Sequence, residues 1–424
     1  MTQRELAPSG DGFHCDVAPG ASAATKGASI AYLGLGELVV RQGYLRWLGK
    51  VALECYKTSG VAANDGAPRQ TGGNTLIFAK RLLFAFFLAG LPGFAAVAAE
   101  KVVVATARTI SDAGLYMAMD NGWFQEEGLD VELVGFDTAA KMIAPLGRGD
   151  LDVGGGTVSA GLYNAVARGI SLRIVADKGS IKPGYAYAGI VIRKDHVDGG
   201  RFKSLADLAG MKIAVVGKGT SNASALNEAL KHGGLAWRDA TPVELSFPQM
   251  VVALSNKAID GAMMNEPTIS QVVREGIAVK GADYNDFYPG QQTAVLIYSE
   301  KFATARREAA QKFMRAYIRG LRFYAGSLAG GRIAGANAER VIDILVRHTG
   351  VTDRDVYRQA APSGVDPDGR IGASSLRNDL VLFKQEQLID KPEMQVEDIV
   401  DMSFVEDALR VLGASAPEAR APIK

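Results

Sequence analysis

Hydroxyl and amide side chains follow two valine-rich runs of this sequence, and their chemistry is that of hydrogen bonding. Thr109 and Ser111 follow the first run, and Thr220, Ser221 and Asn222 follow the second. If helices begin there, their free N–H groups and partial positive charge suit an anion. The same residue types are favoured as helix N-caps, so each residue also has a purely structural interpretation.

Further candidates for ligand contact lie after expected strands or beside an expected crossover: Asp137, Gly156, Thr157, Tyr185, Tyr187, Asn265 and Glu266. Tyrosine rings beside a crossover can sandwich an organic ligand, although they pack the edge of a lobe equally well. Three nearby cations, Arg108, Lys178 and Lys182, would suit a sulfonate or carboxylate. Asp112 and Asp137 would suit an amine, so the charge of the ligand stays open.

Catalytic, metal and nucleic-acid motifs are not found. The run at 217–219 lacks the earlier glycine of a phosphate-binding loop, and there is no G-x-S-x-G elbow. The cysteines, Cys15 and Cys55, both precede residue 56, and the later histidines lack metal-ligand spacing. Basic residues number 47 and acidic residues 46, so there is no global basic field for nucleic acid, although a local basic patch stays open. We expect a binding protein with no catalytic residue, metal or cofactor.

Short apolar strands alternate with helical segments after residue 100, which predicts an α/β fold with parallel sheets. The pattern of 101–156 recurs at 212–264. Six pairs of like residues share one offset of 111, as in 212 − 101: Lys101/Lys212, Val104/Val215, Thr109/Thr220, Leu115/Leu226, Ala118/Ala229 and Gly122/Gly233. We expect two equivalent βαβαβ lobes. Ligands bind beyond the carboxyl ends of such strands, so Thr109 and Thr157 should face Thr220 and Asn265 across a cleft.

Two apolar runs, Gly189–Arg193 and Ala294–Tyr298, bracket the second unit and predict two crossovers. Lobe one is then discontinuous, comprising 100–190 and 298–424, and lobe two spans 191–297. A stripe at spacing four, Phe313, Tyr317 and Leu321, predicts a packed helix face in the returning tail.

The segment 74–99 has the pattern of a secretory signal peptide. Two basic residues precede an apolar run at 82–91, and small residues at 96–98 form a cleavage pattern. A transmembrane anchor is the weaker interpretation, because Pro92 interrupts the run before the ~20 residues that a bilayer requires. No cysteine follows, which disfavours a lipoprotein. We expect residues 1–73 to be a leader, either disordered or translated from a misplaced start, and the product to be periplasmic.

Four stretches resemble the substrate-binding proteins of nitrate, taurine and alkanesulfonate importers, a family that includes binders of thiamine-precursor pyrimidines. They are Gly114–Gly128, Leu146–Gly154, Ser204–Val216 and Ala258–Pro267, and the resemblance extends over 101–413. It implies a two-lobed, Venus-flytrap fold that closes on a small molecule and delivers it to a membrane permease driven by ATP hydrolysis.

The function implied by the resemblance is therefore that of a monomeric solute-binding component of an ABC importer. Its ligand would be a sulfonate, nitrate or carboxylate anion, or a pyrimidine-like compound. Two alternatives stay open: a periplasmic sensor partner, and an enzyme similar to thiamine-pyrimidine synthases. Those synthases carry a cysteine-rich iron motif, whereas this sequence has no cysteine after Cys55.

Overall fold

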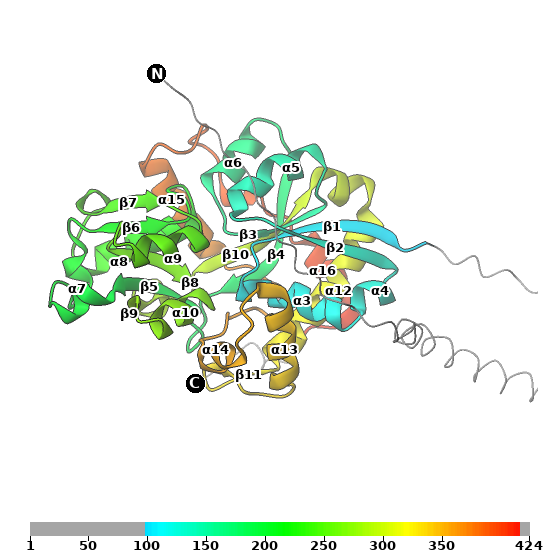
Figure 1. Ribbon diagram of the computed structural model, residues 1–424. Helices are drawn as coiled ribbons and strands as arrows, with labels where there is room; N and C mark the ends of the chain where they lie inside the picture. Colours follow the sequence, from blue (N-terminus) through cyan, green and yellow to red (C-terminus); the bar gives the residue numbers. More distant parts are fainter. Residues whose placement is uncertain (1–97, 416–424) are drawn as a thin grey trace, which may run out of the picture. The chain divides into compact units, whose positions relative to one another are not determined.

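The computed structural model describes residues 98–415, which belong to one compact unit, Ala95–Lys424 (Figure 1). The predicted leader, nearly all of the predicted signal peptide and both cysteines lie outside the described residues. Within 98–415, no helix is long and apolar enough to cross a membrane.

The first sheet has five strands in the order β2-β1-β3-β10-β4. Their bounds are β1 Glu100–Thr106, β2 Leu129–Gly135, β3 Val153–Gly156, β4 Leu172–Ser180 and β10 Gln292–Ser299. The strand β1 pairs in parallel with β2 and β3, and β10 runs antiparallel between β3 and β4. The alternation of strand and helix predicted the parallel part, whereas β10 joins this sheet only after the chain has formed the second sheet.

The second sheet repeats this plan in the order β7-β6-β8-β5-β9. Its strands are β5 Ala188–Arg193, β6 Lys212–Val215, β7 Thr241–Glu244, β8 Gly261–Asn265 and β9 Ala278–Asp283. Again three strands are parallel, and an antiparallel strand, β5, lies between the third strand and an edge strand. Two lobes with one topology follow from this arrangement.

The hydrogen-bond register refines the expected repeat. Asp152 and Asp260 are equivalent, because each carboxylate accepts the backbone N–H of the neighbouring strand, from Val103 and Lys212 respectively. The offset between these strand residues is 109 (212 − 103), not the expected 111. The two additional residues lie in the loop after β6, which restores the offset of 111 at Thr220.

The two expected crossover runs lie in β5 and β10. The chain leaves the first sheet after Ser180 and enters the second at Ala188, so it passes between sheets through 181–187. It returns through 284–291, which includes the short helix α11, Tyr284–Phe287.

Helices cover both sheets. Those of the first lobe are α3 Ala113–Asp120, α4 Trp123–Glu126, α5 Ile143–Arg148, α6 Ala160–Ala167, α12 Arg307–Ala325, α13 Ala338–Thr349, α14 Arg354–Gln359, α15 Ala373–Gln385 and α16 Ser403–Leu412. Those of the second are α7 Lys194–Asp198, α8 Ser221–His232, α9 Phe247–Ser255 and α10 Thr268–Arg274. A short hairpin, β11 Leu328–Ala329 with β12 Arg332–Ile333, precedes α13.

The helix α12 carries the predicted apolar stripe, and Phe313, Tyr317 and Leu321 are fully buried. It crosses α3 at close range, because a Cβ on Gly320 would overlap the carbonyl oxygen of Gly114. The stripe is therefore part of the core of the first lobe, as expected.

Candidate functional site

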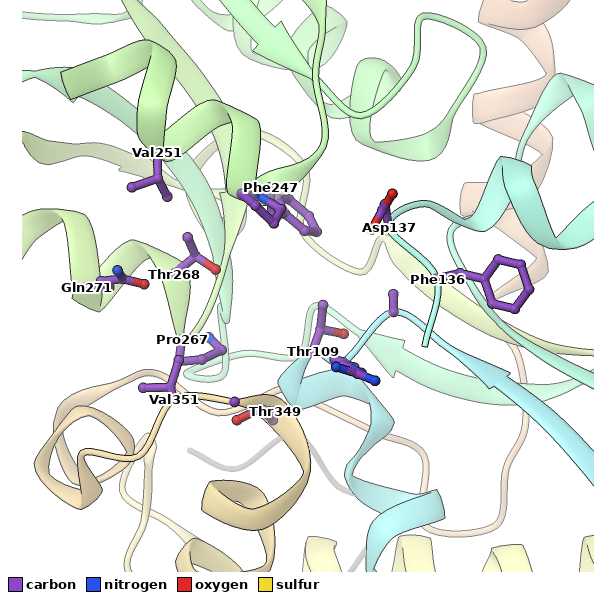
Figure 2. A pocket seen from close by; sticks show the side chains of 14 residues that line it. Thr109, Phe136, Asp137, Phe247, Val251, Pro267, Thr268, Gln271, Thr349 and Val351 are labelled. Carbon is purple, nitrogen blue, oxygen red and sulfur yellow. The ribbon is translucent and has the colours of Figure 1, made fainter. Parts of the chain in front are cut away.

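A cavity of about 490 Å³ lies between the two lobes. Its walls come from the ends of β1 and β2, from α9 and α10, and from the turn after α13: Ala107, Arg108, Thr109, Phe136, Asp137, Phe247, Pro248, Val251, Pro267, Thr268, Gln271, Thr349, Gly350 and Val351. Figure 2 shows the labelled side chains of α9 and α10 on one side and Thr109 and Asp137 on the other. The cavity is therefore at the carboxyl ends of parallel strands, where the fold predicts a ligand.

Thr109 forms part of the wall, and Ser111 supports it from behind. The two hydroxyl oxygens are 2.8 Å apart, and the Thr109 backbone N–H donates to the Asp112 carboxylate at 3.0 Å. Lys178 donates to Ser111 at 2.9 Å and pairs with Asp112 at 2.9 Å, with both charged groups fully buried. Lys178 and Asp112, each considered as a ligand contact, thus neutralise one another beneath the cavity floor.

Arg108 is the cation that the cavity wall exposes. Its guanidinium lies against Gly135, where a Cβ would collide with it. Within residues 98–415 the guanidinium has no carboxylate partner and no hydrogen-bond acceptor. Its backbone φ is 54°, an uncommon conformation for any residue except glycine. An unpaired arginine in this position is suited to a carboxylate, sulfonate or phosphate, which it can bind with two parallel hydrogen bonds.

Asp137 also lines the cavity, but its charge is already paired. Lys141 lies 2.7 Å from the Asp137 carboxylate, and this hydrogen bond lowers the pKa of Asp137. Both side chains are exposed, so the pair is in contact with water. Because Asp137 is compensated and Arg108 is not, the uncompensated charge of the wall is positive.

The remaining wall combines apolar and polar side chains. Phe136 directly follows β2, and Phe247, Pro248 and Val251 come from the first turns of α9. Pro267 and Val351 add to this surface, and the polar groups beside it are Thr268, Gln271 and Thr349. Such walls suit a ligand with a carbon body and a few polar atoms.

The predicted cluster at the start of α8 has structural partners. The Thr220 hydroxyl accepts from the Ala223 N–H at 3.3 Å and donates to the Gly217 carbonyl at 2.6 Å, so Thr220 is an N-cap. Asn222 accepts from the Val216 N–H at 3.0 Å and donates to the Met263 carbonyl. The Ser221 hydroxyl donates to the Thr293 carbonyl at 3.4 Å. None of these three side chains lines the cavity.

This cluster instead joins the lobes. The Ala160 N–H donates to the Gly219 carbonyl at 2.7 Å, and the Ser221 N–H donates to the Val158 carbonyl at 3.0 Å. Thr157 immediately precedes this contact, and Gly156 is buried in β3, where a Cβ would collide with Ala139. The two facing loops were predicted to meet a ligand, and in this conformation they meet each other.

The last four predicted residues lie beside the second sheet. Asn265 ends β8 opposite Ala188, and Glu266 is buried with its carboxylate accepting from the Ser270 N–H at 2.9 Å. Burial raises the pKa of Glu266. Tyr187 is fully buried with its hydroxyl 2.5 Å from that of Thr293, and Tyr185 is also buried. Both rings are therefore buried. Packing against the protein was the alternative to ligand contact that the sequence left open for these two tyrosines.

Of the residues predicted from the sequence, Thr109 and Asp137 line the cavity, whereas its walls from α9 and α10 were not predicted. A signal for α9 was present: Ser246 and Gln249 form a capping box directly after the second strand-like run of the second unit. That position corresponds to Asp137 in the first unit. No local sequence pattern predicted that the turn at 349–351 would line the cavity.

Comparison with known proteins assigns the chain to a family. A model of the NMT1/THI5-like family matches residues 110–327, about half of the chain. The chain therefore belongs to the NMT1/THI5-like family.

Two kinds of curated relative match over part of their length. A putative binding protein of Brucella abortus is 27% identical over 215 residues, which are 48% of this chain and 59% of that protein. The taurine-binding periplasmic protein of Escherichia coli is 25% identical over 226 residues, covering 53% of this chain and 67% of that one. The chain thus spans roughly three fifths of the length of the Brucella relative.

Solved structures share the fold. The alkanesulfonate-binding protein SsuA of Xanthomonas axonopodis, bound to MOPS, aligns with a TM-score of 0.57 at 21% identity, over 71% of this chain and 98% of that one. The nitrate-binding protein NrtA of Synechocystis aligns with a TM-score of 0.60 at 14% identity, over 77% of this chain and 92% of that one. The desulfurization enzyme DSZB aligns with a TM-score of 0.51 at 14% identity, over 74% of this chain and 99% of that one. This is the two-lobed α/β fold of periplasmic binding proteins, in which an enzyme also occurs.

Proposed function

We propose that this protein is the extracytoplasmic solute-binding component of an ABC importer, and that it captures a small organic anion in the cavity between its lobes. One observation carries the proposal: Arg108, which has no ion-pair partner among residues 98–415, lines a cavity whose other walls combine apolar side chains with a few polar ones. The anionic group of the ligand would meet Arg108 and Thr109. The carbon body would lie against Phe247, Val251 and Val351.

The cavity favours some ligand classes over others. A nitrate ion would leave most of about 490 Å³ unfilled and would not contact the apolar walls. A neutral pyrimidine would leave Arg108 without a counter-charge. A sulfonate or carboxylate with a carbon body satisfies both features. The names of the relatives, which include a taurine-binding and an alkanesulfonate-binding protein, support this class.

A thermal-shift screen tests the proposal. The panel would contain straight-chain and aromatic sulfonates, the matching carboxylates, sodium nitrate and a methylated aminopyrimidine. A ligand that binds only the folded state raises stability by RT ln(1 + [L]/Kd), about 2.7 kcal/mol at a hundredfold excess over Kd. We expect stabilisation by organic anions. If the pyrimidine alone stabilises the protein, the anion assignment is wrong, and if turnover of a sulfonate or sulfinate is observed, the protein is an enzyme.

We further propose that the protein is exported through residues 74–99 and acts as a periplasmic monomer with a membrane permease as its partner. The basic residues, apolar run and cleavage pattern at 80–98 support this. N-terminal sequencing of the protein from a periplasmic fraction should begin near Ala99. A product that retains Cys15 or Cys55 would contradict cleavage at this site.

A further inference from the structure

The turn between α13 and α14 forms one wall of the cavity, although it lies beyond the residues that match the family model. It is held on the first lobe by His348, whose ring stacks on Tyr116 at 4.6 Å between centroids. The same imidazole lies 2.7 Å from the Asp120 carboxylate. Thr349 and Val351, directly after His348, are therefore placed at the cavity by contacts with α3.

The turn is also tied internally. The Thr349 hydroxyl donates to the Leu345 carbonyl at 2.9 Å, and the Tyr357 hydroxyl donates to the Val351 carbonyl at 3.1 Å. The first bond lies within α13, whereas the second, together with the contact between the Thr349 and Tyr357 hydroxyls, joins α14 to the end of α13 across the turn. Thr349, Gly350 and Val351 thus move with the first lobe as one piece.

This piece reaches across to the second lobe through one ion pair. Asp353, the N-cap of α14, pairs with Arg274 in the last turn of α10. The helix α10 also carries Thr268 and Gln271, which line the opposite wall. The two walls are therefore joined by a charge pair whose members belong to different lobes.

We propose that the turn 349–353 is a clamp that holds the cavity closed and that the Arg274–Asp353 pair is its fastening. This inference rests on the proposed function, in which the lobes open to exchange a ligand. An interaction between lobes stabilises only the closed state, so it shifts the equilibrium toward closure. Both side chains are about half exposed, at 51% and 44%. The pair therefore changes the equilibrium between open and closed lobes by a modest factor, and salt weakens it. The Arg274–Asp353 pair would therefore slow release of the ligand, although neither side chain contacts the ligand.

Three variants of the processed chain test the clamp: Arg274→Gln, Asp353→Asn and the double variant. Asparagine is chosen because Asp353 also accepts the Asp355 N–H at 2.9 Å as an N-cap, a role that asparagine keeps. The control is Arg148→Gln, which breaks an exposed pair with Asp150 inside the first lobe.

The first measurement needs no ligand. The backbone N–H groups of Ala160 and Ser221 bond across the lobes, so their hydrogen exchange reports closure. We expect exchange about two- to fivefold faster in each single variant, no further change in the double variant, and no change in the control. Raising the salt concentration should remove the difference. If both single variants exchange at the wild-type rate, the clamp does not exist.

The second measurement uses 1-pentanesulfonate as the probe. Its dissociation rate should rise about two- to fivefold in the same variants, with an association rate close to that of the wild type. Equal dissociation rates in wild type and both single variants would overturn the clamp. If the wild type does not bind pentanesulfonate while exchange responds as expected, the clamp stands and a straight-chain sulfonate is not the ligand.

Discussion

Arg108 combines a left-handed backbone conformation with a charge that has no ion-pair partner among residues 98–415. Its φ of 54° places it in the left-handed region, which costs a non-glycine residue free energy and is concentrated at functional sites. Asparagine tolerates this conformation better than most residues. Arg108→Asn therefore removes the charge with little added backbone strain, which makes it the cleanest test of the site.

We expect Arg108→Asn to weaken binding of an organic anion about ten- to hundredfold, because hydrogen bonds to charged groups contribute about 1.5–3 kcal/mol. Unfolding free energy without ligand should stay within about 0.5 kcal/mol of wild type, since the guanidinium has no partner to lose. Calorimetric titration and chemical denaturation measure the two quantities. The matched control is Arg148→Asn, an exposed arginine away from the cavity. Equal anion affinity in Arg108→Asn and wild type would remove Arg108 from the site.

Asp379 is a buried carboxyl at the seam between α15 and the second lobe. It accepts a hydrogen bond from the Tyr288 hydroxyl at 2.7 Å, and Tyr288 also accepts from Asn378 at 2.8 Å. Burial raises the pKa of Asp379 to about 7, and the negative charge of Glu228 on α8 acts in the same direction, against hydrogen bonds that lower it. The folded protein therefore prefers the protonated form of this side chain.

This preference gives a pH dependence with a definite sign. The pKa of an unfolded aspartate is about 3.9, so the stability contributed by protonated Asp379 is fully present below about pH 4 and is lost as the pH rises toward 7. We expect the unfolding free energy of wild type relative to Asp379→Asn to fall over this window, by at most about 1.4 kcal/mol per pH unit. Denaturation of both proteins from pH 4 to 8 measures the difference. A difference that rises with pH would show that Asp379 is stabilised as a carboxylate.

At the scale of elements, α12 is the helix around which the first lobe packs. Phe313 stacks on Phe124 at 4.8 Å between ring centroids and meets the edges of Tyr298 and Phe302 at 6.1 Å. Its side chain is fully buried. Replacing Phe313 by a small residue would leave a cavity that the rigid neighbouring rings do not fill.

Phe313→Ala should therefore lower the unfolding free energy by about 3–5 kcal/mol. The ligand site lies elsewhere, so the affinity of the remaining folded protein should change less than twofold. Urea denaturation and titration at a temperature well below the transition measure the two effects. A large loss of affinity in fully folded Phe313→Ala would mean that α12 is coupled to the cavity.

The elements were predictable because their signals are local. The stripe at Phe313, Tyr317 and Leu321 predicted a buried helix face, and all three are buried. The site was less predictable, as Thr109 and Thr220 illustrate. Both threonines follow a first strand and precede a helix, yet Thr109 lines the cavity and Thr220 caps α8 and contacts the other lobe. Local chemistry fits both roles, and only the packing of the loops decides between them.

The molecule as a whole adds what no local pattern contains. Val351 and Arg108 line one cavity although 243 residues separate them (351 − 108). Their proximity depends on how α13 returns to α3, which involves His348 and Asp120. Such a contact follows from tertiary structure alone. The sequence therefore predicted a cleft between the lobes, but not that the turn after α13 would form one of its walls.

The two lobes are joined by 181–187 and 284–291, which makes a hinge motion the expected response to a ligand. A saturating organic anion should reduce the radius of gyration of a chain that begins at Ala99 in small-angle scattering. The reason is that the Ala160–Gly219 bond and the Arg274–Asp353 pair both require lobes that lie together. Buffer with sodium chloride at equal ionic strength is the control. An unchanged radius with a confirmed tight ligand would mean that this protein binds without closing.

The position of β10 between β3 and β4 also sets an order of events during biosynthesis. The strand β4 ends at Ser180, but within the described sheet it pairs only with β10, which ends at Ser299. The first sheet thus stays incomplete until more than a hundred further residues have left the ribosome. All five strands of the second sheet lie between Ala188 and Asp283, so that sheet can form without the later chain. The second lobe can therefore complete its sheet before the first lobe does, although the first lobe contains the earlier part of the chain.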